Sequence, residues 1–150
     1  MLIKYPRGIE KLETESRKDP PRLRDIKVRV HWGVAGAGKS WDAMMNHEEK
    51  DVFILEKPDH GPIRWDGYTN QKVLIIEDFR GWISFSTLLR LLDKYPFKMN
   101  VKYGYAKAHW TTVYITANIP PQEWYPSKGY PPQLERRLHE VIEYTTPYVD

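Results

Sequence analysis

Eight consecutive residues have the types and the spacing to hold a phosphate chain: Gly33-Val34-Ala35-Gly36-Ala37-Gly38-Lys39-Ser40. The glycines allow successive backbone N–H groups to curl around the β- and γ-phosphates of a nucleotide. Lys39 adds positive charge to those phosphates, and the Ser40 hydroxyl can ligate Mg²⁺. The run fills every fixed position of a phosphate-binding loop, so it predicts a site for ATP and Mg²⁺.

Two carboxylates follow a second conspicuous run. Residues 73–76 are all apolar, as expected for a strand covered on both faces, and Glu77 and Asp78 come directly after them. In open α/β sheets, nucleotides bind at this end of the strands. One carboxylate can hold Mg²⁺ while the other orients or deprotonates the attacking water. We assign Glu77 to the metal and Asp78 to the water, and the reverse assignment stays open.

Two later features can complete the chemistry of phosphate hydrolysis. Asn118 follows the apolar run 113–117, and its amide can hydrogen-bond the γ-phosphate or the attacking water. Arg136 and Arg137 can neutralise charge on the γ-phosphate bound to a neighbouring subunit. The alternatives are an ordinary turn residue before a proline for Asn118, and a solvated basic helix face for the arginines.

The elements that must position these groups alternate along the chain. Alternating apolar residues predict a strand at 26–32 that enters the phosphate loop, followed by a helix at 39–46. Apolar runs predict strands at 52–55 and 73–76, and Ser84 caps a helix that stops before Pro96. Two β-rich pieces at 97–103 and 107–117 are expected to form an antiparallel hairpin added to the sheet. A helix at 132–139 and a terminal strand complete an α/β sandwich with a mostly parallel sheet.

Composition limits the classes of function. The 150 residues suit one domain, which we divide into an N-terminal helical arm at 1–21 and a core at 22–150. The absence of cysteine excludes disulfides and thiolate metal sites. No apolar run is long enough to span a bilayer, so we expect an intracellular protein without a membrane partner. A net charge of +3 permits nucleic-acid binding.

The order of these motifs, with Lys102 between Asp78 and Asn118, resembles that of superfamily 3 helicases. More narrowly, the chain resembles the helicase domain of replication-initiator (Rep) proteins of circular single-stranded DNA viruses, in particular the circovirus-like group. Further matching elements are Arg64-Trp65-Asp66-Gly67-Tyr68, Glu77-Asp78-Phe79-Arg80-Gly81-Trp82, Tyr95-Pro96 and Glu123-Trp124-Tyr125. The resemblance implies an AAA+-like P-loop NTPase core, a hexameric ring with ATP at the subunit interfaces, and translocation along single-stranded DNA.

The resemblance also implies DNA contacts and a location. Lys102 corresponds to a DNA-contacting lysine on a hairpin that lines the pore, with Lys98 and Lys107 beside it and Tyr103 and Tyr105 able to stack on bases. A lysine-rich hairpin is alternatively an edge protected against aggregation. Residues 4–18 correspond to the family's oligomerisation segment, and the viral likeness implies the host nucleus.

The chain also departs from complete Rep proteins, which carry a nicking domain with a His-hydrophobe-His triplet. No such triplet occurs here, so we expect either a helicase domain from a longer protein or a protein without the nuclease. Two other functions remain open. One is a small-molecule or nucleoside kinase, and the other is a nucleotide-gated DNA-binding ring that does not unwind DNA.

Overall fold

The computed structural model describes residues 19–34 and 39–145. In these ranges five parallel strands form one sheet in the order β2–β3–β6–β1–β7. The strands are β1 (Lys27–Gly33), β2 (Val52–Leu55), β3 (Val73–Ile76), β6 (Thr112–Ala117) and β7 (Glu140–Tyr144). The helices are α2 (Lys39–Met45), α3 (Phe85–Leu91) and α4 (Pro132–Glu135), with short 3₁₀ turns at Glu49–Asp51 and Pro121–Glu123.

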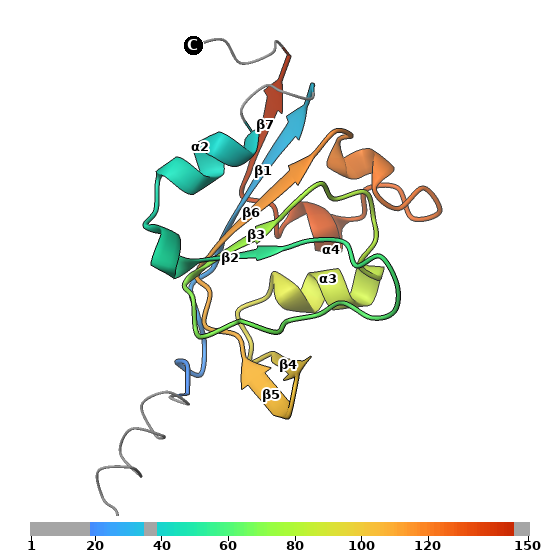
Figure 1. Cartoon of the computed structure of the whole chain (residues 1–150). Helices are drawn as coiled ribbons and strands as arrows, with labels where there is room; N and C mark the ends of the chain where they lie inside the picture. The colour runs from blue at the N-terminus through green and yellow to red at the C-terminus, as the bar shows by residue number, and fades with distance from the viewer. Residues whose placement is uncertain (1–18, 35–38, 146–150) are drawn as a thin grey trace, which may run out of the picture.

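The sheet is the middle layer of a three-layer sandwich. α2 lies on one face, and α3 and α4 lie on the other (Figure 1). Successive strand residues point to opposite faces, so β2, β3 and β6 contribute to two apolar clusters. The smaller cluster, on the α2 side, consists of Ala43, Val73, Ile75 and Tyr114. The larger one includes Val28, Val30, Leu74, Ile76, Val113 and Ile115. The expected α/β sandwich is confirmed, and β3 is buried on both faces.

The expected antiparallel hairpin at 97–117 is wrong in its second half. The hairpin consists of β4 (Lys98–Val101) and β5 (Gly104–Lys107), and it forms a two-stranded sheet of its own. The following strand, β6, instead lies in the centre of the main sheet, parallel to β1 and β3. Its burial explains this placement, because Val113, Ile115 and Ala117 lie in the larger core cluster and could not remain on an added edge.

Two further expectations concern the ends of the chain. The helix expected at 132–139 is only one turn long, since α4 ends at Glu135. The backbone N–H of His139 already donates to Val28 O at 3.0 Å, so the chain has left the helix to join β1. The expected N-terminal helical arm falls almost wholly outside the described residues, which begin at Asp19.

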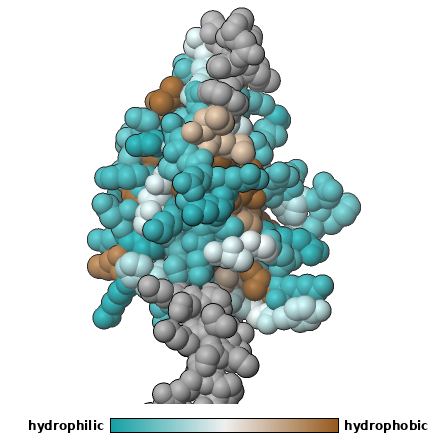
Figure 2. Space-filling view, turned by 60° about the vertical axis from the view of Figure 1, so that its left-hand side comes forward, coloured by the Kyte–Doolittle hydropathy of each residue, from teal (hydrophilic) through white to brown (hydrophobic). Residues whose placement is uncertain are grey.

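Many aromatic side chains pack in the hydrophobic core. Trp65 stacks on Trp110 with ring centroids 5.3 Å apart, and Tyr68 and Phe97 pack on the same pair. The face of the molecule turned forward in Figure 2 is mainly hydrophilic, with scattered apolar residues. Within the described ranges, none of the helices combines the length and apolarity needed to cross a membrane.

Candidate active site

The predicted site residues meet at the carboxyl edge of the sheet. β6 lies between β1 and β3, so the residues that follow these three parallel strands converge there. A cavity of about 810 Å³ opens at this edge. Its lining includes Lys39, Ser40, Glu77, Asp78 and Asn118, together with Glu56, Lys57, Arg80, Trp82 and Thr116. The structure therefore brings together groups that are up to 79 positions apart in the chain.

Three oxygens hold the ammonium group of Lys39. Lys39 Nζ donates to Asn118 Oδ1 at 2.8 Å and to the carbonyl oxygens of Gly33 and Val34 at 2.7 and 3.2 Å. Burial lowers the pKa of Lys39, and the Asp78 carboxylate opposes that shift. A cation near the cavity, already linked to Asn118, is suited to phosphate oxygens. The loop residues Ala35, Gly36, Ala37 and Gly38 lie outside the described ranges.

Ser40 and Glu77 form the second connection across the site. Ser40 Oγ donates to Glu77 Oε1 at 2.9 Å, and Glu77 N donates to Leu55 O, which ties the acidic turn to β2. A hydroxyl and a carboxylate are hard oxygen donors, and Mg²⁺ prefers few protein ligands combined with phosphate oxygens and water. The donor set of Ser40, Glu77 and Asp78 therefore fits Mg²⁺.

Asp78 has an unusual backbone conformation beside Glu77. Its φ is +51°, in the left-handed region that few residues other than glycine adopt. Its carboxylate lies 3.7 Å from Arg80 Nε across an exposed pair. The Asp78 N–H donates to Thr116 Oγ1, and its carbonyl oxygen accepts from the Trp82 indole. Sequence reasoning identified Asp78 but not these contacts. Trp82 ends the Glu77–Trp82 motif and Thr116 lies in the run 113–117, yet only tertiary contact reveals their link to Asp78.

Gly33 is required for a reason that the phosphate-loop pattern does not contain. Its φ is +133°, and a Cβ built on it would lie 2.2 Å from the carbonyl oxygen of Tyr144 in β7. The next residue, Val34, donates its N–H to the same oxygen at 2.9 Å. The start of the loop is thus fixed against β7, which leaves no room for a side chain.

Arg136 and Arg137 lie at the opposite end of the sheet, beside the amino ends of the strands. This arginine pair precedes Glu140, the first residue of β7, and β7 runs parallel to β1. Arg137 Nη2 forms an ion pair with Asp93 Oδ2 at 3.0 Å, and Arg137 Nη1 donates to Gln133 O. Arg136 is exposed, and its side chain has no ion-pair partner in the part of the chain that the structure describes. Within the chain, neither arginine lines the cavity that contains Lys39.

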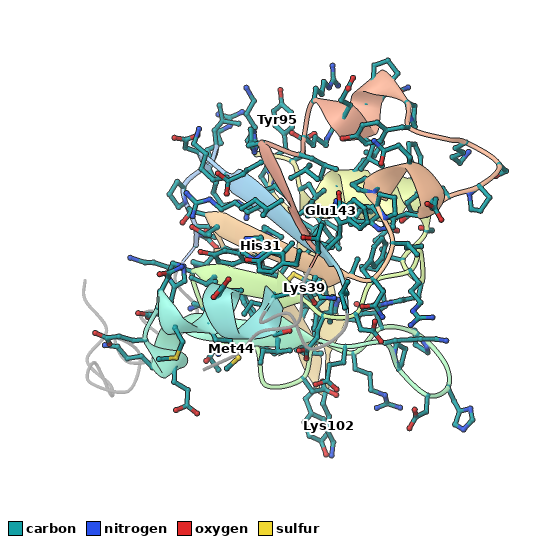
Figure 3. The ribbon with its side chains drawn as sticks, turned by 90° about the horizontal axis from the view of Figure 1, so that it is seen from above. His31, Lys39, Met44, Tyr95, Lys102 and Glu143 are labelled. Atoms are coloured by element: carbon teal, nitrogen blue, oxygen red, sulfur yellow. The ribbon has the colours of Figure 1, made fainter. Side chains whose placement is uncertain are left out.

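The β4–β5 hairpin is well separated from this cavity. Figure 1 shows it at the amino end of the parallel strands, and Figure 3 shows Lys102 far from Lys39. Lys102 and Tyr103 form the tip, where the Tyr103 side chain is 95% exposed. The ammonium groups of Lys98 and Lys102 lie over the rings of Tyr105 and Tyr103, at 4.3 and 5.2 Å. Each of the two pairs combines a positive charge with an aromatic ring.

Lys107, the third predicted lysine, is already paired. Its Nζ lies 2.6 Å from Asp19 Oδ1, and this hydrogen bond raises the pKa of Lys107 while lowering that of Asp19. Its charge is therefore partly compensated at the base of the hairpin. The DNA-binding role of all five hairpin residues stays a prediction.

Comparisons with known proteins show the family of this chain. A family model described as RNA helicase matches residues 30–119, more than half of the chain. The replication-associated protein of canary circovirus is 38% identical over 143 residues, which cover 93% of this chain and 46% of that protein. The replication-associated protein of human associated cyclovirus 1 is 34% identical over 122 residues, covering 78% and 42%. The chain thus spans about half the length of the curated relatives it matches.

The fold also has a solved counterpart. The S. cerevisiae Hsp104–ADP complex aligns with 93% of this chain and 32% of its own, with a TM-score of 0.51 and 12% identity. At that identity the likeness concerns the fold alone. It confirms the expected P-loop, AAA+-like arrangement of strands and helices.

Proposed function

This chain belongs to the RNA helicase family, as a circovirus-like superfamily 3 helicase domain, and on that premise we propose that it is an ATP-driven motor that translocates on single-stranded DNA. One observation carries the proposal. The Lys39–Asn118 and Ser40–Glu77 hydrogen bonds join the phosphate loop to both acidic and amide groups across three strands. That arrangement offers the phosphate-binding, metal-binding and water-orienting groups for hydrolysis of a nucleoside triphosphate, apart from a trans-acting arginine.

Each residue has a defined part in the proposed reaction. Lys39 binds the β- and γ-phosphates, and Asn118 orients the γ-phosphate or the attacking water. Ser40 and Glu77 hold Mg²⁺, which neutralises charge on the phosphate oxygens when bound. Asp78 accepts the proton of the attacking water as general base. The cavity lies on a rigid sheet edge, so these groups are positioned before the nucleotide enters.

We assign the trans-acting role to Arg136 rather than Arg137. Arg137 is held by Asp93 and Gln133 within its own subunit, whereas Arg136 projects from the surface. Arg136 lies at the amino ends of the strands and Lys39 at the carboxyl ends. Arg136 can therefore reach a γ-phosphate bound at Lys39 only if that Lys39 belongs to a neighbouring subunit. This supports ATP at the interfaces of a homo-oligomeric ring, which we propose to be a hexamer with the β4–β5 hairpins toward the DNA.

The test measures binding and turnover together. We expect Mg·ATP to bind in calorimetry, and Lys39→Ala to lower ATP hydrolysis by about 100-fold or more, because it removes the positive charge that stabilises the transferred phosphate. Lys27→Ala, at the exposed amino end of β1, the strand that leads into the phosphate loop, is the control and keeps wild-type turnover. A folded protein without affinity for Mg·ATP would contradict the proposal.

Assembly is tested by light scattering, with and without a non-hydrolysable ATP analogue and oligo-dT. We expect nucleotide to shift the population from monomer to a ring. Unwinding of a tailed duplex then separates a motor from a ring that only binds DNA, because only the motor displaces the strand.

A further inference from the structure

We propose that Thr116 is a positioning residue that sets the Asp78 carboxylate for catalysis, with Trp82 as its second support; this inference rests on the proposed ATPase function. Thr116 lies on β6, the strand next to β3. Its side chain is one of few buried polar groups, with an exposed fraction of 2%. Such a group needs a hydrogen-bond partner, and here the partner is the backbone of Asp78.

Thr116 holds the acidic turn at two consecutive residues. The Asp78 N–H donates to Thr116 Oγ1 at 3.0 Å, and the Phe79 N–H donates to Thr116 O at 2.8 Å. From the other side, Trp82 Nε1 donates to Asp78 O at 3.1 Å. Both polar backbone atoms of Asp78 are therefore bonded to groups outside the β3 ladder, which fixes the direction in which its side chain leaves the turn.

The bonds hold a conformation that the backbone does not favour by itself. Asp78 has φ +51°, and residues other than glycine rarely take this value. The turn allows Phe79 to enter the core, where it is fully buried against Trp124, while Asp78 lines the cavity. Without the Thr116 hydroxyl, the Asp78 N–H has no acceptor and the carboxylate loses its fixed direction.

Thr116 also links the two halves of the site. It stands two residues before Asn118, whose Oδ1 accepts from Lys39. One strand end therefore positions both the amide that contacts the phosphate loop and the carboxylate that activates water. A shift of the acidic turn of the order of 1 Å lowers the rate without removing any group that binds ATP.

The experiment compares steady-state hydrolysis of ATP by Thr116→Val and Thr116→Ser. Valine keeps the shape of the threonine side chain but removes the hydroxyl that accepts from the Asp78 N–H. We therefore expect kcat to fall about tenfold while KM for ATP stays within about twofold. Serine keeps the hydroxyl and retains most of the wild-type kcat. Thr112→Val is the matched control, because Thr112 lies on the same strand and its side chain points to the same face of the sheet, and it keeps wild-type kcat. Melting temperatures accompany all variants.

Two further measurements keep the inference testable if valine impairs folding. Trp82→Phe removes the indole donor and keeps an aromatic ring against Phe79, and we expect a lower kcat with little change in KM. In an Asp78→Asn background, Thr116→Val lowers kcat no further, because both changes act through one carboxylate. An unchanged kcat in both Thr116→Val and Trp82→Phe, or an equal loss in the Asp78→Asn background, overturns the inference. A wild-type chain that does not hydrolyse ATP contradicts the proposed function instead.

Discussion

At the scale of single residues, each group of the site is held by a partner from another element. Lys39 is bonded to Asn118 after β6, Ser40 to Glu77 after β3, and Asp78 to Thr116 in β6. Such cross-strand bonds restrict the side chains before a ligand arrives, which reduces the reorganisation needed during reaction. In the proposed reaction, Thr116 would therefore matter as well as the groups that contact the nucleotide.

Gly81 illustrates this dependence outside the reacting groups. Its φ is +89°, and a Cβ there would lie 2.1 Å from the carbonyl oxygen of Trp124. We expect Gly81→Ala to lower the free energy of unfolding by about 2 kcal/mol or more, because the backbone oxygen cannot move aside as a flexible side chain does. Urea denaturation measures the loss.

Gly67→Ala is the control for that prediction. Gly67 has a similar φ of +93°, but nothing lies within 4 Å of its added Cβ. Gly67→Ala is therefore expected to lower the free energy of unfolding by about 1 kcal/mol, from the unfavourable backbone conformation alone. Equal losses in the two variants would show that the approach of Trp124 is not tight.

At the scale of elements, the β4–β5 hairpin is the most independent part of the fold. It pairs with no strand of the main sheet, and its tip carries Lys102 and the fully exposed Tyr103. Its inner side is anchored, since Met99 is buried in the larger core cluster. The tip can therefore change without loss of the sheet that carries the nucleotide site.

We predict that Lys102→Ala keeps basal ATP hydrolysis and loses most of its stimulation by oligo-dT. The lysine offers a charge to the DNA backbone, and it lies far from the cavity (Figure 3). Turnover with and without oligo-dT, at two salt concentrations, measures the effect. Lys107→Ala serves as the comparison and loses less, because Asp19 already pairs with Lys107. Equal loss of basal and stimulated rates would assign Lys102 to folding.

At the scale of the whole molecule, the surfaces to which we assign functions lie at opposite ends of the sheet. The nucleotide cavity is at the carboxyl ends of the strands, and the hairpin and the arginine pair are toward the amino ends (Figure 1). Among the described residues that line the cavity, Arg80 is the only arginine. In the proposed ring, a neighbouring subunit completes the site, so we expect turnover to depend on assembly.

This gives a prediction about mixtures. Arg136→Ala and Lys39→Ala are each expected to be inactive alone, and mixing them restores part of the turnover, because an intact site can form between the Lys39 of one subunit and the Arg136 of another. Specific activity of the wild type rises faster than linearly with protein concentration. Arg137→Ala is expected to act differently, through loss of its ion pair with Asp93 and lower stability. No recovery in the mixture would remove Arg136 from the interface.

The sequence by itself determined the chemistry and the alternation of elements. Phosphate loops, acidic turns and buried apolar runs are local patterns, so Lys39, Ser40, Glu77, Asp78 and Asn118 were recognisable before any contact was known. The length of α4 and the pairing of β6 were not, because helix ends and strand neighbours depend on distant partners such as Val28.

Only the tertiary structure decided which groups meet. The insertion of β6 between β1 and β3 brings Asn118 to Lys39 and Thr116 to Asp78, and a strand's place in a parallel sheet is set by packing on both faces rather than by its own residues. The same packing separates the arginine pair from the cavity and fixes Gly33 and Gly81 against backbone oxygens. Local sequence specifies the functional groups, and long-range burial specifies their distances.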